Sequence, residues 1–257
     1  MTRKYWVPAI ERADKIIALL AKEPSSLKLM DLANRLDIHK SSMYSLLTTL
    51  ETLGWVTKEK GDTYALGPTL GVISASYFRQ FNLMQSFHQE ARMTVRHVGE
   101  AVQLAMLDRQ DVVYLAKEES ASPMRLVSDP GMRFAAYATA LGKIQLSHLS
   151  AEELDDLFQE EELEPKTKYT VATRTELYEQ LELIRQQQVA VDRDEAVEGF
   201  CCVAAPIYNH ANKMIAAVSI SMSSTMWKEK EELAREEIIS LGHRISQHAG
   251  HQKEERG

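Results

Sequence analysis

Cysteine is scarce in this sequence: there are two, Cys201 and Cys202, and they are adjacent. A small secreted protein held together by disulfides needs more cysteines at wider spacing, so the composition favours a reducing compartment. The chain also lacks any apolar run near the roughly 20 residues that a membrane-spanning helix needs. Its first residues are basic and lack the apolar stretch of a signal peptide. We therefore expect a soluble, cytoplasmic protein with no membrane partner.

Sequence motifs of the common enzyme classes are also missing. The chain contains no HExxH, GxSxG, P-loop or GxGxxG pattern. These patterns supply metal ligands, nucleophiles or phosphate-binding loops, so their absence lowers the expectation of catalysis. We expect a protein that is not an enzyme and that needs no cofactor and no metal.

A net positive charge is missing as well, because the formal net charge is -7. The charge is unevenly distributed. Residues 1–66 hold ten Lys and Arg against eight Asp and Glu, whereas residues 67–257 hold twenty against twenty-nine. This asymmetry indicates that the two parts of the chain have different partners. The acidic remainder also excludes a protein that coats nucleic acid without sequence preference.

The first third of the chain contains apolar residues at helical spacing. Together with two short β-like runs, this spacing predicts helices over about 10–20, 29–36 and 40–53, and strands over 55–58 and 63–66. A short break at residues 37–39 separates the second helix from the third, and a polar turn separates the two strands. Three helices, a tight turn and a hairpin in this order predict a winged helix-turn-helix.

The rest of the chain mixes helices with strands. We expect helices over about 69–79, 83–98, 139–149, 175–188 and 228–248, and strands over 101–107, 112–117, 202–208 and 214–222. Strands paired through hairpins predict an α+β domain with an antiparallel sheet. Alternation along 214–222 puts Ser219 and Ser221 on one face of that sheet, together with Ile215 and Ala217.

Three segments of the chain resemble the IclR family of regulators. They are LKLMDLANRLDIHKSSMYSLLTTLETLGWV with the following YALGPTLG, then GMRFAAYATALGKIQLSHL, then VAVDRDEAVEGFCCVAAPIYNHANKMIAAVSIS. The resemblance runs from about residue 7 to residue 241. It implies a winged helix-turn-helix in 1–67, a linker helix in 68–81 and a GAF-like or profilin-like effector domain in 82–250. It also implies a homodimer that often pairs into a tetramer, with repression as the commoner output.

The third predicted helix is the candidate recognition helix. Met43, Leu46 and Leu47 fall on its inner face, so its hydroxyl-bearing side faces outward. A recognition helix reads bases in the major groove mainly through its first turns. We expect contacts to double-stranded DNA from His39, Lys40, Ser41, Ser42, Tyr44, Ser45, Thr48, the wing residues Lys58 and Lys60, and Arg3 in the N-terminal arm. Family members commonly carry Arg where this chain has Ser45, so base contacts should be weaker here.

The small number of basic residues has a consequence for affinity. A monomer that contacts few phosphates binds weakly. Two half-sites bound together restore affinity, because the second contact is made at high effective concentration. We therefore expect a two-fold dimer on an approximately palindromic operator.

The candidate effector site lies in the C-terminal part. Two hydroxyls on the inward face of an apolar sheet suit a pocket that orients a small polar ligand. Thr139 can cap the helix that follows it, which leaves the amides of Ala140 and Leu141 free for an anion. The resemblance implies effector contacts at Ala140, Leu141, Asp192, Cys202, Ser219 and Ser221, with apolar walls at Leu126, Phe134 and Phe200. We expect the effector to be a small organic acid.

Other interpretations stay open at this point. The adjacent cysteines could act as a redox or metal sensor, although vicinal disulfides are strained and two thiols form an incomplete zinc site. The chain could also be an interaction module that has lost DNA binding, since its positive charge is sparse. Asp192 could serve only to pair with Lys143 or Arg193.

Overall fold

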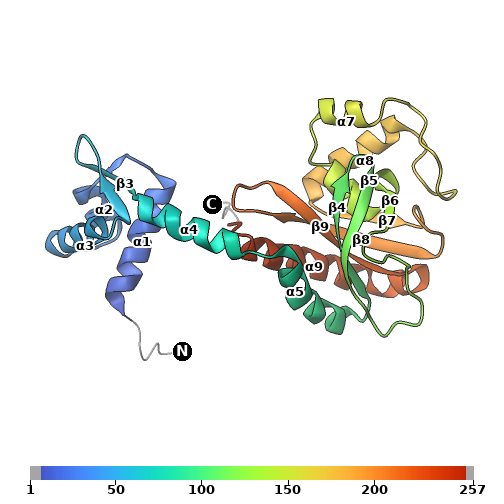
Figure 1. Cartoon of the computed structure of the whole chain (residues 1–257), viewed down its shortest axis with the longest axis horizontal. Coiled ribbons are helices and arrows are strands. Elements are labelled where there is room, and N and C mark those ends of the chain that lie inside the picture. Colours follow the sequence, from blue (N-terminus) through green and yellow to red (C-terminus); the bar gives the residue numbers. More distant parts are fainter. Residues whose placement is uncertain (1–6, 253–257) are drawn as a thin grey trace. The chain divides into compact units, whose positions relative to one another are not determined.

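The computed structural model describes residues 7–252, apart from the side chains of residues 77–80. The chain folds into two compact units, Met1–Gln80 and Phe81–Gly257 (Figure 1). One apolar cluster fills the N-terminal unit, and two clusters pack on the sheet of the C-terminal unit.

The N-terminal unit is a winged helix-turn-helix, as predicted. Its elements are α1 (Pro8–Lys22), β1 (Leu27–Lys28), α2 (Leu29–Arg35), α3 (Lys40–Thr52), β2 (Val56–Lys58), β3 (Thr63–Leu66) and α4 (Pro68–Gln80). Strands β1 and β2 both pair antiparallel with β3, and the β2–β3 hairpin is the wing. The apolar faces of the first three helices meet in a core in which Ile16, Leu32 and Met43 are fully buried.

A sharp corner separates α2 from α3. Asp37 adopts a left-handed conformation with φ 50°, which ends the regular path of α2. The amide of the next residue, Ile38, donates to the carbonyl of Ala33 at 3.0 Å, and the Ile38 side chain is buried. This corner fixes α3 as a separate helix.

The C-terminal unit is an α+β domain built on one antiparallel sheet. Its elements are α5 (Leu83–Val98), β4 (Ala101–Asp108), β5 (Asp111–Glu118), β6 (Arg133–Ala135), η1 (Ala136–Ala138), α6 (Ala140–Leu146), α7 (Ala151–Leu157), α8 (Arg174–Gln187), β7 (Ala190–Arg193), β8 (Phe200–Tyr208), β9 (Met214–Ser223) and α9 (Ser224–His248). The strand order is β6-β5-β4-β9-β8-β7. Helices α5 and α9 cover one face of the sheet, and α6 and α8 cover the other (Figure 1).

Alternation along β9 sorts its side chains onto the two faces. Ala217, Ser219 and Ser221 face α6, and Val218 and its alternate neighbours face α5 and α9. The predicted shared face of Ser219, Ser221 and Ala217 is thus confirmed. The prediction for Ile215 was wrong, because Ile215 packs in the cluster on the other face. The β8–β9 register shifts between Ile207 and Tyr208, and the shift reverses the alternation at that end.

Several elements differ from the predicted ones. Helix α6 ends at Leu146 rather than at residue 149, and α9 begins at Ser224 rather than 228, with Ser223 capping its first turn. The elements β1, β6, η1, α7 and β7 were not predicted. Each has two to seven residues, which is too few for a periodic pattern to emerge.

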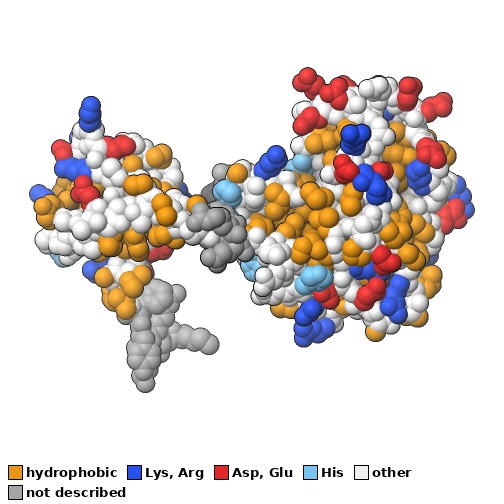
Figure 2. All heavy atoms as spheres, in the orientation of Figure 1, with side chains coloured by type: hydrophobic (Ala, Val, Ile, Leu, Met, Phe, Trp, Pro, Cys, Tyr) orange, Lys and Arg blue, Asp and Glu red, His pale blue; other side chains and the backbone are white. Residues whose placement is uncertain are grey.

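The surface is uneven in charge. Figure 2 shows acidic side chains gathered in the region where Figure 1 labels α7.

Within residues 7–252, none of the helices combines the length and the apolar character that crossing a membrane requires.

Candidate functional site

The outer face of α3 is open to solvent. Seven of the predicted DNA-contacting residues belong to this helix or to its start, and six of them are exposed: His39, Lys40, Ser41, Tyr44, Ser45 and Thr48. The seventh, Ser42, is half-buried. Tyr44 is 63% exposed, which is high for an aromatic residue. The opposite face, with Met43 and Leu47, is buried in the core. The helix therefore presents an accessible polar face of the kind that enters a DNA groove.

Internal hydrogen bonds reduce what the α3 hydroxyls can offer. Ser45 donates its hydroxyl hydrogen to the carbonyl of Ser41 at 3.1 Å. Thr49 donates in the same way to the carbonyl of Ser45 at 2.9 Å. With its hydrogen used inside the helix, Ser45 can present only acceptor lone pairs outward.

An ion pair lies within the wing. Lys58 Nζ is 2.6 Å from Asp62 Oδ1, and both side chains are exposed. Their hydrogen bond raises the pKa of Lys58 and lowers the pKa of Asp62. Lys60 is exposed at the turn between the strands. The remaining predicted contact, Arg3, lies outside the described residues.

The predicted effector residues converge on one small cavity of about 10 Å³. Its lining residues come from the sheet, from η1–α6 and from two loops: Tyr114, Leu126, Phe134, Thr139, Ala140, Leu141, Asp192, Ala196, Cys202 and Ser219. Seven of the nine predicted residues are among them. The other two are Phe200, which is half-buried against the same apolar cluster, and Ser221, which is hydrogen-bonded to Gln103. A cavity of this size holds about one water molecule.

Three lining residues were not predicted: Tyr114, Thr139 as a wall, and Ala196. A signal for Tyr114 exists in the sequence, because it alternates with Val112 along β5 and so shares the buried face of Val112. Ala196 lies in the turn between β7 and β8, where no periodic pattern applies.

Thr139 caps α6 as predicted. Its Oγ1 accepts a hydrogen bond from the amide of Gly142 at 3.0 Å. The first amides of a helix have no intrahelical acceptor, so those of Ala140 and Leu141 remain available to a ligand. Because α6 has only seven residues, these individual N–H groups matter more than any helix dipole.

Asp192 is buried at the edge of this cavity. Its Oδ1 accepts the amides of Glu195 at 2.7 Å and Ala196 at 3.4 Å. Lys143 pairs with Glu195, and Arg193 pairs with Glu231 at 2.9 Å, so neither basic residue is the ion-pair partner of Asp192. Burial raises the pKa of Asp192 to about 7. The carboxyl group can therefore donate or accept a hydrogen bond near neutral pH.

The two cysteines are free and buried. Burial raises the pKa of Cys202 well above its usual value and also raises that of Cys201. Such thiols are poor nucleophiles, because the thiolate is the reactive form. Among residues 7–252, no group of three or more His, Cys, Asp or Glu side chains is placed to hold a metal ion.

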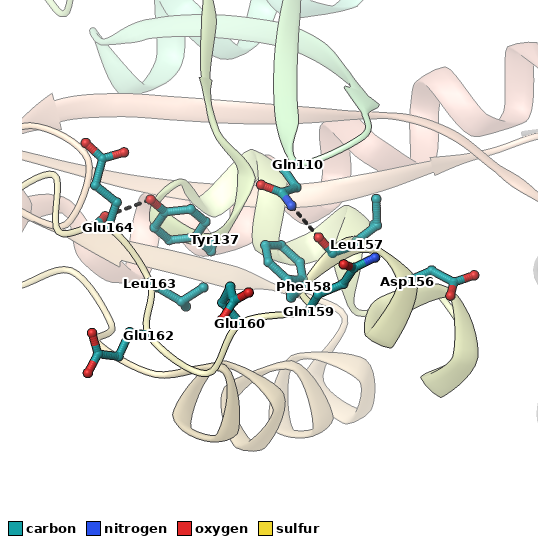
Figure 3. A pocket seen from close by; sticks show the side chains of 10 residues that line it. All are labelled: Gln110, Tyr137, Asp156, Leu157, Phe158, Gln159, Glu160, Glu162, Leu163 and Glu164. Atoms are coloured by element: carbon teal, nitrogen blue, oxygen red, sulfur yellow. Dashed lines mark hydrogen bonds between the residues drawn. The ribbon is translucent and has the colours of Figure 1, made fainter.

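A larger hollow of about 500 Å³ lies elsewhere on the C-terminal unit (Figure 3). Tyr137 and Phe158 pack edge-to-face in its wall, and the Tyr137 hydroxyl donates to the carbonyl of Glu164 at 2.7 Å. Figure 3 shows the carboxylates of Asp156 and Glu164 pointing away from the Tyr137 ring. Its polar groups do not converge, and none of the predicted effector residues lines it.

Similarity to known proteins extends over nearly the whole chain. Residues 75–247 match the family model for the bacterial transcriptional regulator IclR C-terminal domain, and residues 9–60 match the IclR helix-turn-helix domain. The regulator XynR of Escherichia coli is 30% identical over 248 residues, which cover 95% of this chain and 98% of that protein. The regulator KdgR of Dickeya chrysanthemi is 29% identical, over 86% of this chain and 72% of that protein.

A solved structure supports the same assignment. The repressor BlcR of Agobacterium tumefaciens superposes with a TM-score of 0.84 at 29% identity, over 96% of this chain and 99% of that one. These relatives are transcription regulators rather than enzymes, and they give no support to a redox or metal sensor. The chain thus belongs to the IclR family of helix-turn-helix transcription regulators.

Proposed function

We propose that this regulator is a repressor whose operator binding is modulated by a small organic acid. Two relatives carry repression in their names, the acetate operon repressor of Salmonella typhimurium and the transcriptional repressor IclR of Escherichia coli. The observation that carries the ligand proposal is the convergence of Asp192, Ser219 and the α6 amides on one buried cavity.

At the DNA end, the proposal places α3 in the major groove. Ser41, Ser42, Tyr44 and Thr48 would face base edges, with His39 at the start of the helix and Ser45 contributing only as an acceptor. Lys40 and Lys60 would contact phosphates, together with Arg3 from the arm; Lys58 would do so only after leaving Asp62. So few contacts support a dimer, or a pair of dimers, on an approximately palindromic operator. Binding to genomic DNA would place the protein in the cytoplasm.

At the sensing end, the cavity must enlarge to admit a ligand. Leu126, one of its walls, belongs to the connection of residues 119–132 between β5 and β6. A movement of this connection would open the cavity, and connections of this length are often functional. The ligand would then favour one arrangement of the DNA-binding units, with the helix in 68–81 as the linker.

A screen of small carboxylic acids by thermal shift tests the ligand proposal. An effector should raise the melting temperature of the wild-type protein, raise it less in Ser219→Ala/Ser221→Ala, and change operator affinity. Ser246→Ala is the matched control, since this buried serine bonds to Tyr208 and Gly242 away from the cavity. Equal shifts in the wild type and the double variant would remove this cavity from consideration.

A further inference from the structure

A buried carboxamide lies between the two serines of β9. Gln103 on β4 has no exposed surface and is the direct cross-strand neighbour of Ser219. Its Nε2 donates to Ser221 Oγ at 2.7 Å and to Ser128 Oγ at 3.4 Å. Its Oε1 accepts from Ser219 Oγ at 3.1 Å. One side chain thus contacts both predicted effector serines.

The direction of these hydrogen bonds follows from chemistry. A carboxamide oxygen cannot donate, so Ser219 must be the donor in its bond to Gln103. The observed orientation of the amide gives both Nε2 hydrogens an acceptor, in Ser221 and Ser128. The reverse orientation would leave one buried N–H without its acceptor, at a cost in free energy. The hydroxyl hydrogen of Ser219 is therefore committed to Gln103.

We propose that Gln103 is a specificity-determining positioning residue that makes the effector a hydroxy acid. With its hydrogen committed, Ser219 presents only lone pairs to the cavity that it lines. A hydroxyl group on the ligand can donate to those lone pairs, whereas the oxygen of an oxo acid would face them acceptor to acceptor. This inference rests on the proposed effector cavity and adds the class of acid that fits it.

The neighbouring polar wall is compatible with a hydroxyl ligand. Tyr114 lines the same cavity and carries a phenol that can donate. A ligand hydroxyl can accept from that phenol while donating to Ser219, since a hydroxyl does both. An oxo group could use the phenol but would leave the lone pairs of Ser219 unsatisfied. Such an unsatisfied buried group costs about tenfold or more in affinity.

Calorimetric titration of the full-length protein with matched acids tests this inference. Suitable probes are lactate, pyruvate and propionate, and also 2-hydroxyglutarate, 2-oxoglutarate and glutarate. These probes form two series, of three and of five carbon atoms. In whichever series binds, the hydroxy acid should bind at least about tenfold more tightly than the oxo acid and the unsubstituted acid. Gln103→Met frees the hydrogen of Ser219, so the hydroxy-to-oxo ratio should fall to about twofold or less.

Gln145→Met is the matched control. Gln145 is also buried and hydrogen-bonded, to Leu107 and Leu141, but it does not contact either serine of β9. It should keep the wild-type ratio. Should Gln103→Met fail to fold, Ser219→Ala serves instead, because it removes the acceptor and should collapse the same ratio.

The outcomes separate this inference from the function on which it rests. Equal binding of hydroxy and oxo acids by the wild type, or a preference for the oxo acid, would overturn the role of Gln103 while leaving an acid-binding cavity. An unchanged preference in Gln103→Met would overturn it as well. Binding of none of the six acids would contradict the organic-acid effector itself.

Discussion

Lys58 Nζ lies 2.6 Å from Asp62 Oδ1 at the end of the wing. Both side chains are exposed, and exposed pairs of this kind contribute little to folding stability. The pair matters instead for DNA, because it offsets a positive charge where a phosphate contact was predicted. Any phosphate bound by Lys58 must compete with Asp62.

Replacement of Asp62 should therefore strengthen operator binding. Asp62→Asn leaves Lys58 free to contact a phosphate, which should raise affinity and steepen the logarithmic salt dependence by about one. Fluorescence anisotropy with labelled operator over a range of salt concentrations measures both quantities. In a Lys58→Met background, Asp62→Asn should change operator affinity and its salt dependence no more than the control substitution Glu59→Gln does. A salt dependence that stays the same would show that Lys58 makes no phosphate contact.

A second prediction concerns the close approach of α6 to η1. A Cβ added at Gly142 would lie 2.1 Å from the carbonyl oxygen of Ala136 and 2.3 Å from its Cα. The backbone must move to accept it, so Gly142→Ala should destabilise the protein by about 3 kcal/mol and lower its melting temperature. Gly71→Ala is the control, because nothing lies within 4 Å of the added Cβ at that helical position. Equal melting temperatures for the two variants would contradict this packing.

The third prediction is a pH dependence of stability that originates at Asp192. Its pKa is about 7 in the folded chain and 3.8 in the reference state. Between these values the folded state holds a proton that the unfolded state has lost. The contribution of Asp192 to stability should therefore fall as pH rises through this window and level off above it.

Asp192→Asn, which is neutral at every pH, should flatten that dependence. Urea unfolding from about pH 5 to about pH 8 would measure it, with a change on the order of a few kcal/mol in the wild type. Asp156→Asn is the control, since Asp156 is exposed on α7. If the stability of Asp192→Asn changed with pH as steeply as that of the wild type, the buried carboxyl would not be the source of the pH dependence.

The fourth prediction concerns the buried thiols. Burial keeps the pKa of both Cys201 and Cys202 above its usual value, so few thiolates are present at neutral pH. Iodoacetamide should label neither residue in the folded protein and both after denaturation, as read by mass spectrometry. Operator binding should be unchanged by reductant or by Cys201→Ser/Cys202→Ser. Rapid labelling together with a loss of DNA binding on oxidation would revive the redox sensor.

The sequence predicted long, periodic elements well. The bounds of α3 differ from those predicted by one residue, because its apolar spacing is regular and Gly54 follows it in a left-handed conformation with φ 70°. The same regularity located the serines of β9 on the face that lines the cavity.

Interactions that depend on strand register could not be predicted. Gln103 and Ser219 are 116 residues apart, and only the pairing of β4 with β9 brings them together. A lone polar residue in an apolar strand gives no sign of its partner before that register is known. The Lys58–Asp62 pair likewise depends on the path of the hairpin rather than on residue type.

The central claim is that the exposed face of α3 reads an operator. Selection of genomic fragments by the purified protein tests it most directly, with Lys40→Ala/Tyr44→Ala as the comparison and unchanged melting temperature as the folding check. We predict that the wild type enriches fragments sharing an approximate palindrome, and that the double variant loses this enrichment. Fragments without a shared sequence, or the same palindrome enriched by both proteins, would contradict the account.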